Sequence, residues 1–379
     1  MADHRKIDRR DFLKCASWAA GAAGAAAMGG GHLFGRVGAA GVLREPPVPP
    51  FPPFPPVPPL PGAPYDQSGQ LHFPITDLGK AAPPAKVALV KGPDRYDIVM
   101  RSLRLIEDEV AASIRGKRVL IKPNIVLADC AACVTHIDAM RAVLDFISPH
   151  VKGEILIGES SVHNTAEGYK YNDYQRLEKE YRAKLVDLNL DKFQHRYVLG
   201  LDNKPSKIRI INTLLDPDLY IISVARMKTH NYVFVTLSIK NVIMASPLND
   251  YKKSDKSLMH QASPARNDLL HYNMFHIGRE IFPDLAVIDG FIGIEGNGPA
   301  WGAPIASHVA LASRDAVAAD ITATRVMGFD PRIVNYLNAM AEGGMGQGDY
   351  DKIQLVGTPL EQCITKYKPN EKMAELYKL

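Results

Sequence analysis

The sequence has few cysteines and, beyond its first residues, no long apolar run, and each shortage excludes a class of protein. Four cysteines occur among 379 residues. Cys15 belongs to the leader described below and Cys363 stands alone, so this chain by itself does not provide the four thiolates of an iron–sulfur cluster. No later apolar run reaches the ~18 residues that a transmembrane helix needs. We therefore expect no transmembrane helix in the mature chain.

The chain also has little net charge. Its formal charge is +4, and residues 1–39 hold six Lys or Arg against three Asp or Glu. About one positive charge therefore belongs to the rest of the chain. This balance does not predict nucleic acid as a partner.

The first 39 residues have the composition of an export signal. Arg9 and Arg10 precede Phe-Leu-Lys, and an uncharged stretch rich in Ala and Gly follows from Cys15 to Gly31. This pattern resembles a twin-arginine signal, with cleavage expected after Ala39. The resemblance implies the twin-arginine translocase as a partner and a final location in the periplasm or at the outer side of the cytoplasmic membrane. That route carries folded proteins, often with a cofactor already inserted. A retained N-terminal anchor is the alternative.

Residues 40–79 form a proline-rich segment. Twelve prolines fall within residues 46–64, and an apolar residue recurs at every third position. Polyproline II has ~3 residues per turn, so these apolar residues share one face of the predicted rod. The rod either docks that face on its own domain or on a protein partner, or acts as a stiff linker.

From about residue 80 to residue 379, apolar runs of strand length alternate with helical patterns, which is typical of βαβ units. The runs 118–121, 154–157, 220–225 and 284–288 predict buried strands. We expect an α/β fold with a doubly wound, mainly parallel sheet and helices on both faces. The region forms one domain, or a core with a small insertion around residues 190–215, where 196–199 and 208–211 pair as a hairpin.

Polar residues cluster where these predicted strands end. Because the carboxyl ends of parallel strands share one edge of a sheet, we expect the clusters to line one crevice. Lysines there indicate an anionic ligand, a carboxylate or a phosphate. The alternative is that each cluster only caps local structure or carries surface charge. The predicted catalytic residues are His230, Lys228 and Lys240, and the predicted ligand-binding residues are Lys122, Asn124, Glu159, Ser160, Asn241, Gly296 and Gly298.

The loop 289–299 is rich in glycine, which lets backbone N–H groups turn toward anions. Gly296 and Gly298 are the binding candidates in it. Its spacing matches neither the dinucleotide fingerprint nor the phosphate loop, so no nucleotide is specified. Asp289 and Glu295 are hard oxygen ligands, which makes a divalent metal one cofactor option. The alternative is a tight connection in which Asp289 caps local turns.

Cys130 and Cys133 have the spacing of a redox pair. They form a local disulfide or remain as thiols, and a redox role is a third option.

These motifs together resemble domain-of-unknown-function family 362 over roughly residues 85–358. The resemblance rests on Val119–Asn124, on the stretch from Lys228 to Asn241, on the Asp289–Pro299 loop with Gly302, and on the stretch from Ala319 through Gly328. Many relatives carry a twin-arginine leader. The positions of this chain that match those characteristic of the family are Lys122, Asn124, Lys228, His230, Lys240, Asn241, Asp289, Glu295 and Asp320. The resemblance assigns no activity, and the chain carries no ferredoxin module such as some relatives have.

The sequence leaves three functions open. The first is a metal-assisted enzyme in which lysines hold the anion while His230 transfers a proton. The second is a non-catalytic binding or accessory protein. The third is a redox accessory that uses Cys130 and Cys133 with a partner.

Overall fold

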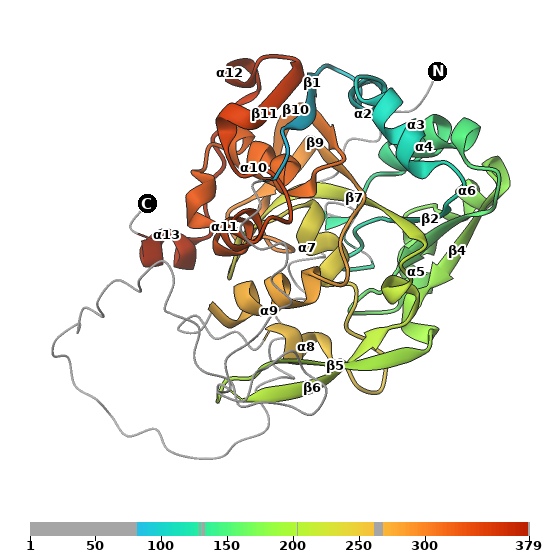
Figure 1. Ribbon diagram of the computed structural model, residues 1–379, viewed down its shortest axis with the longest axis vertical. Helices are drawn as coiled ribbons and strands as arrows, with labels where there is room; N and C mark the ends of the chain where they lie inside the picture. The colour runs from blue at the N-terminus through green and yellow to red at the C-terminus, as the bar shows by residue number, and fades with distance from the viewer. Residues whose placement is uncertain (1–81, 129, 131–132, 203, 261–267, 378–379) are drawn as a thin grey trace, which may run out of the picture. The chain divides into compact units, whose positions relative to one another are not determined.

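The structure is a computed structural model that describes residues 82–377, apart from residues 129, 131–132, 203 and 261–267 (Figure 1). The predicted export signal and proline-rich segment lie outside the described residues. Within the described residues, no helix has both the length and the apolar character needed to cross a membrane.

The described strands and helices alternate for much of the chain. The strands are β1 (Ala85–Lys91), β2 (Arg118–Lys122), β3 (Ile155–Glu159), β4 (Ala183–Asp187), β5 (Phe193–Leu199), β6 (Pro205–Ile211), β7 (Leu219–His230), β8 (Phe234–Thr236), β9 (Leu285–Glu295), β10 (Ala303–Ser313) and β11 (Ile353–Gly357). The helices are α2 (Arg95–Arg104), α3 (Glu107–Ile114), α4 (Ile137–Ile147), α5 (Thr165–Tyr171), α6 (Gln175–Glu180), α7 (Ser238–Ile243), α8 (Lys256–His260), α9 (Asp268–Gly278), α10 (Ala316–Val326), α11 (Asn335–Glu342), α12 (Leu360–Cys363) and α13 (Glu371–Tyr377).

The main sheet is mostly parallel. In the described part of the chain it has nine strands, in the order β11-β1-β10-β9-β7-β2-β3-β4, with β8 paired to β7. The pairs from β9 through β4 are parallel, whereas β10 pairs antiparallel with both β1 and β9. The predicted mainly parallel α/β sheet is therefore confirmed.

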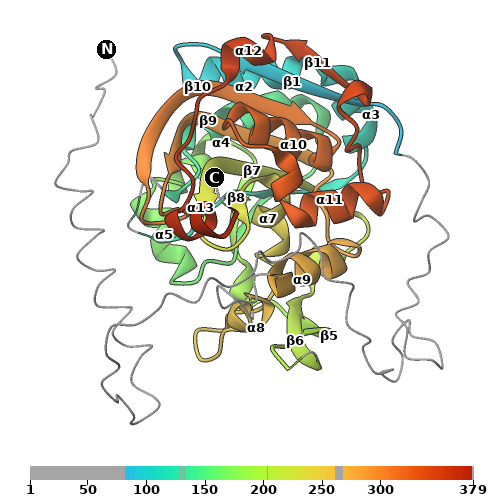
Figure 2. The ribbon, with the colours of Figure 1, turned by 90° about the vertical axis from the view of Figure 1, so that its left-hand side faces the viewer.

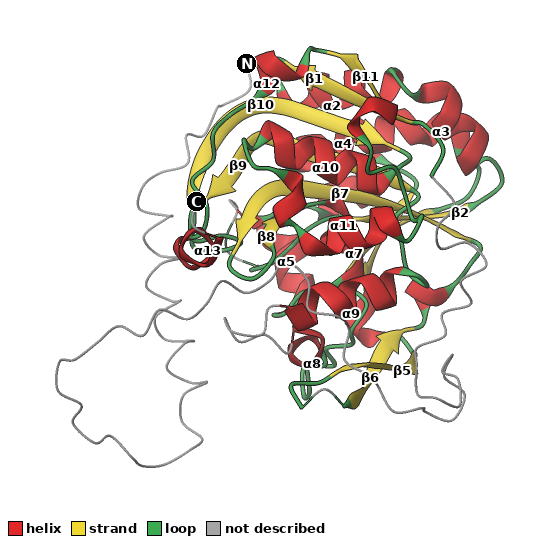
Figure 3. Ribbon diagram, turned by 60° about the vertical axis from the view of Figure 1, so that its left-hand side comes forward, coloured by secondary structure: helices red, strands yellow, loops and turns green. Residues whose placement is uncertain are grey.

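Helices cover both faces of this sheet. Neighbouring residues of one strand enter different apolar cores: Leu120 of β2 packs in one and Ile121 in the other. Helices α2, α3 and α4 contribute to the core that contains Ile121, while α7, α9, α10 and α11 contribute to the core that contains Leu120. Figure 3 shows the second group of helices lying over the sheet. Successive side chains of a strand point to opposite faces of the sheet. Because both faces are covered by apolar cores, the strand sequences read as continuous apolar runs.

Two central strands are longer than the sequence predicts. β7 continues through Lys228 to His230, and every residue in it is buried. β9 continues past Asp289 and Gly290 to Glu295, and it pairs with β10 as a long curved ribbon (Figure 2). The prediction ended both strands at their polar residues. That was wrong because the polar side chains find partners within the fold and so remain in the strand.

The predicted hairpin at residues 196–199 and 208–211 is present as the antiparallel pair β5–β6. It forms a separate two-stranded sheet, and α8 and α9 pack against it.

Candidate functional site

A cavity of about 190 Å³ lies at the carboxyl ends of β2, β3 and β7. Seven of the residues that the sequence predicts line it: Lys122, Asn124, Glu159, Ser160, His230, Lys240 and Asn241. They come from α7 and from the ends of β2, β3 and β7 or the residues just after them, and together they span more than 100 positions of the chain. Carboxyl ends of parallel strands form such crevices in open α/β sheets.

Glu159, the carboxylate of this cavity wall, is fully engaged. Its Oε1 lies 2.7 Å from Lys122 Nζ and accepts a hydrogen bond from Ser160 N at 2.6 Å. Its Oε2 accepts from Ile125 N at 2.6 Å. Both Lys122 and Glu159 are buried, and burial lowers the pKa of Lys122, although Glu159 counteracts the shift. The pair therefore largely compensates its own charges, and Glu159 forms no ion pair with Lys228 or Lys256.

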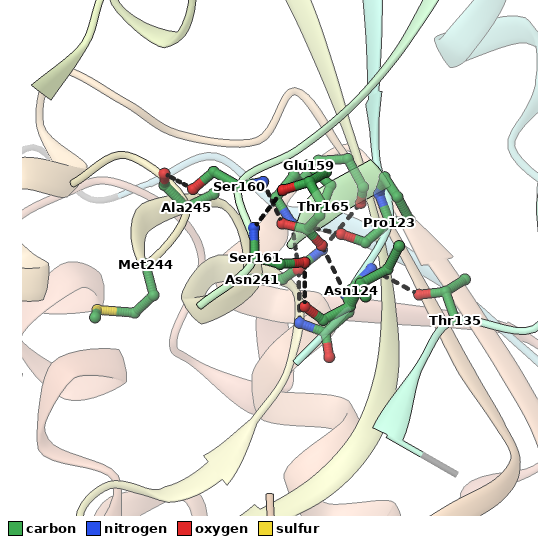
Figure 4. Close-up of polar contacts among 12 residues, drawn as sticks. Pro123, Asn124, Thr135, Glu159, Ser160, Ser161, Thr165, Asn241, Met244 and Ala245 are labelled. Carbon is green, nitrogen blue, oxygen red and sulfur yellow. Dashed lines mark hydrogen bonds and ion pairs between the residues drawn. The ribbon is translucent and has the colours of Figure 1, made fainter. Parts of the chain in front are cut away.

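Asn241 fixes the junction between α7 and β2. Its Oδ1 accepts from Asn124 Nδ2 at 2.9 Å and from Lys122 Nζ at 3.2 Å. Its Nδ2 donates to Lys122 O and to Ser223 Oγ, both at 3.0 Å. Figure 4 shows Asn124, Glu159 and Asn241 meeting at this point. With all four hydrogen-bonding positions of Asn241 used, this wall is rigid.

Lys228 lies in β7, and its ammonium contacts the side chain of Asn124. Its Nζ donates to Asn124 Oδ1 and, at 2.9 Å, to Cys133 O. Burial, reinforced by the neighbouring cations Arg226 and Lys240, lowers the pKa of Lys228 well below its ordinary value. Lys228 thus orients Asn124 but does not itself line the cavity.

His230 ends β7 and lines the cavity. Its Nδ1 accepts a hydrogen bond from Tyr232 N at 3.0 Å, so in the neutral ring Nε2 carries the proton. Burial first, and then Lys240, lowers the pKa of His230 well below its ordinary value. The side chain is therefore neutral at physiological pH.

Lys240 is held at the cavity by the start of α7. Asp320 is completely buried and accepts from Ser238 N at 2.9 Å and from Ile239 N at 3.0 Å, which caps this helix. Burial raises the pKa of Asp320 to about 8, although the two N–H donors favour the carboxylate. Lys240 is 6% exposed, and its ammonium has no hydrogen bond or ion pair with any described residue. Burial lowers the pKa of Lys240 to about 8.

Two further polar residues, Thr236 and Lys256, line the cavity. Thr236 Oγ1 is buried and has no hydrogen-bond partner among the described residues. Lys256, at the start of α8, donates from Nζ to Ser160 Oγ at 2.7 Å and to Met244 O at 2.9 Å. Burial, together with Lys122 and Lys240, lowers the pKa of Lys256 to about 7.

Sequence reasoning missed Lys256 and Thr236. From the sequence His260 is only a weak site candidate, and it also lines the cavity. Lys256 follows Lys252, Lys253 and Ser254, a stretch that reads as an exposed loop. Only the tertiary contacts of α8 bury it, so no local signal was available.

Gly296 and Gly298 do not line the cavity, although Pro299 does. Gly296 N donates to Lys368 O at 2.7 Å, and Gly298 N donates to Gly296 O at 2.8 Å. Gly298 also packs against the backbone of Thr229, where a Cβ atom would clash. The predicted backbone cradle for an anion is therefore absent at these two residues, because neighbouring carbonyl groups already take their N–H groups.

The predicted metal ligands Asp289 and Glu295 are not brought together. They are six residues apart along β9, which corresponds to about 20 Å at the usual rise of a strand. Asp289 is paired with Arg95, whose Nε lies 3.1 Å from its Oδ2, and Glu295 accepts from Lys368 N. Among the described residues, no group of three or more His, Cys, Asp or Glu is arranged to hold a metal ion.

Cys130 and Cys133 are joined in a disulfide, and both are buried. The bridge lies next to Lys228, because Cys133 O accepts from that lysine. Its burial favours a structural role over exchange with a partner thiol.

Two families match the sequence, one at each part of the chain. The first 28 residues match the family described as Ubiquitinol-cytochrome C reductase Fe-S subunit TAT signal. That match covers a signal alone, and it shows that the chain is exported across the membrane by the twin-arginine route.

The thylakoid-associated protein of Synechocystis sp. is 24% identical over 257 residues, which covers 67% of this chain and 76% of that protein.

Two solved structures are similar at low identity. The lactate racemase apoprotein from Thermoanaerobacterium thermosaccharolyticum is 14% identical, with a TM-score of 0.41, and covers 63% of this chain and 56% of its own. A structural-genomics protein from Thermotoga maritima is 12% identical, with a TM-score of 0.39, and covers 68% of this chain and 60% of its own. This chain thus spans less than two thirds of either structure.

Residues 119–325 match the family described as Domain of unknown function (DUF362). The matched range contains all seven predicted residues that line the cavity. Because it also spans more than half of the sequence, the chain belongs to the DUF362 family.

Proposed function

We propose that this exported chain binds a small carboxylate or phosphate in the cavity at the strand ends. The observation that supports it best is Lys240, which is 6% exposed and lines the cavity, and whose ammonium has no hydrogen bond or ion pair with a described residue. A largely buried cation without a partner is unfavourable in a folded protein. Such a group is retained where a ligand of opposite charge completes it.

The charges around the cavity support the same conclusion. Among the described residues that line it, Lys122, Lys240 and Lys256 accompany one carboxylate, Glu159. Glu159 is already engaged by Lys122 and two N–H groups. An anion beside Lys240 would compensate the excess positive charge, and Thr236 Oγ1 would gain a hydrogen-bond partner.

The size of the cavity limits the ligand. Pockets for drug-sized molecules enclose roughly 300–1,000 Å³, whereas this one encloses about 190 Å³. We therefore expect a short-chain acid or a small phosphate compound rather than a nucleotide.

The role of His230 differs between an enzyme and a binding protein. In its neutral form it presents Nε2–H as a donor while Nδ1 is held by Tyr232 N. In an enzyme, this N–H would give a proton to, or stabilise, a reacting oxygen of the bound anion. In the non-catalytic alternative it contributes only a hydrogen bond to the ligand. The metal-assisted version has no support from the positions of Asp289 and Glu295.

Calorimetric titration of the mature chain with inorganic phosphate and with succinate tests the proposal. Replacing Lys240 with Met keeps the length of the side chain and removes its charge. Since a hydrogen bond to a charged group contributes about 1.5–3 kcal/mol, we expect Lys240→Met to weaken binding about 10- to 100-fold. The fold should be retained, because the change removes a buried cation.

Lys179→Met is the matched control, since Lys179 is an exposed lysine on a helix, α6. It should bind each anion as the unmodified chain does. Failure of both anions to bind the unmodified chain, or equal affinity in Lys240→Met, would reject the proposal.

A further inference from the structure

Ser160 and Lys256 form a pair inside the cavity. Ser160 follows β3 and Lys256 begins α8. The two residues are 3% and 6% exposed, respectively. Lys256 Nζ lies 2.7 Å from Ser160 Oγ, and both residues line the cavity. Ser160 Oγ accepts a hydrogen bond from Lys256 Nζ and donates its own proton to Ala245 O at 2.6 Å, a contact drawn in Figure 4, so this hydroxyl has to turn from the carbonyl to the amine before Lys256 takes its proton. A hydroxyl group thus lies within hydrogen-bond reach of an amine at the wall of the cavity.

Among the described residues no carboxylate forms an ion pair with Lys256, although the nearby Glu159 acts to raise its pKa. Besides Ser160, the oxygen atoms near its Nζ are the carbonyl groups of Met244 at 2.9 Å and Ala245 at 3.5 Å. The acid of the cavity, Glu159, is engaged by Lys122. Burial with Lys122 and Lys240 nearby lowers the pKa of Lys256 to about 7, so near neutral pH a large share of the molecules carries the free amine. A free amine has the lone pair that a general base needs.

We propose that Ser160 is a nucleophile, that Lys256 is its general base, and that the cavity hydrolyses small acyl compounds that carry an anionic group. The inference rests on the proposed function in one respect: the anionic group of the substrate occupies the position beside Lys240. A serine hydroxyl is a weak nucleophile by itself, and an adjacent base within hydrogen-bond reach is what activates it. The pair therefore has the geometry of a serine–lysine variant of nucleophilic catalysis.

The reaction proceeds in two balanced steps. Ser160 Oγ bonds to the carbonyl carbon while the Lys256 amine takes the hydroxyl proton; the bond to the leaving group then breaks, and Lys256 returns the proton to that group. Water next attacks the carbonyl carbon of the acyl-serine ester while Lys256 takes a proton from the water; the bond between that carbon and Ser160 Oγ then breaks, and Lys256 returns the proton to Oγ. The products are a carboxylic acid and the protonated leaving group, and no electrons are gained or lost.

Acetyl phosphate is a suitable probe, because it is a small acyl compound with an anionic group. The mature chain is incubated with it, phosphate release is followed, and the acetylated residue is located by peptide mass spectrometry. We expect an acetyl group on Ser160. Since general base catalysis contributes typically 10²–10⁴-fold, release of phosphate should fall at least about 100-fold in Ser160→Ala and in Lys256→Met.

The pH profile separates a base from a mere positive charge. Release by the unmodified chain should rise between pH 6 and 8 as the Lys256 amine loses its proton. Lys256→Arg keeps the charge but stays protonated in this range, so it should be as slow as Lys256→Met. Lys252→Met, a change at an exposed lysine of the preceding loop, should release phosphate at the unmodified rate.

Phosphate affinity, measured by calorimetry, distinguishes the two proposals. If Ser160→Ala binds phosphate normally but the unmodified chain forms no acetyl-serine, the nucleophile is rejected and the anion site stands. If acetyl-Ser160 forms while phosphate does not bind, the anion site is rejected and the nucleophile stands. Acetyl groups on lysines only, or full activity in Lys256→Arg, also overturn the inference.

Discussion

At the scale of single residues, the buried lysines oppose folding in the ligand-free chain. A lysine loses hydration when it is buried, and a nearby cation adds repulsion, so the neutral amine is favoured. Lys240 and Lys256 show this directly, because burial lowers their pKa values to about 8 and about 7. The cavity is therefore maintained at a cost to stability, which is common where a protein has a ligand to bind.

This cost predicts how stability depends on pH. Lys240 has a pKa of about 8 when folded and 10.5 ordinarily, so between these values the unfolded chain binds a proton that the folded chain lacks. The free energy of unfolding then rises with pH, by at most about 1.4 kcal/mol per pH unit for each such proton. Below pH 8 the raised pKa of Asp320 makes the free energy of unfolding fall as pH rises, because there the folded chain holds a proton that the unfolded chain lacks. The rise due to Lys240 is therefore expected only above about pH 8.

Chemical denaturation between pH 8 and 9.5 measures this slope. We expect a shallower slope for Lys240→Met and an unchanged slope for Lys179→Met. The same slope in all three proteins would show that Lys240 keeps its ordinary pKa in the folded chain.

At the scale of elements, Asp320 on α10 determines where α7 begins, and so where Lys240 and Asn241 lie. Replacing Asp320 with Ala leaves two buried N–H groups without an acceptor, so we expect a loss of about 2 kcal/mol or more in unfolding free energy. Anion affinity, measured by calorimetry on the folded protein, should fall as well.

Asp315 offers a matched comparison, since it caps α10 through Ala318 N, and it does not line the cavity. Asp315→Ala should lower stability but leave anion affinity unchanged. If Asp320→Ala binds anions as tightly as Asp315→Ala does, α7 is not positioned by its cap.

The sequence predicts the elements better than it predicts their ends. The apolar runs locate β2 and β3 to within two residues at each end, and the rule for parallel sheets brings Lys122, Glu159 and Asn241 to one place. Lys228 and His230 were expected beyond the strand, but their polar contacts let β7 continue through them. The positions of Gly296 and Asp289 depend on the β9–β10 ribbon, and the burial of Lys256 depends on α8. Neither arrangement has a local signal.

At the scale of the whole molecule, the Cys130–Cys133 disulfide suits a protein that is exported to an oxidising compartment. It closes a short loop, for which the chain-entropy relation gives a stabilisation of about 2 kcal/mol. We expect the double variant Cys130→Ser/Cys133→Ser to lose about this amount, as measured by denaturation without reducing agent.

The unmodified chain in reducing agent is the control, and it should match the double variant. Equal stability of the oxidised chain and the double variant would show that the bridge is not structural. The redox accessory function would then become the stronger hypothesis for this pair.

The scarcity of acidic partners around Lys240 and Lys256 has a consequence for the exported protein. The anion proposed to bind beside Lys240 would restore the ordinary basicity of that amine, so the complex would hold more protons than the empty protein and the free anion together. Occupancy would then follow the acidity of the surroundings: the cavity would fill as the external medium becomes acidic and empty as it becomes alkaline. Uptake and release of the anion would follow external pH without any moving segment of the chain.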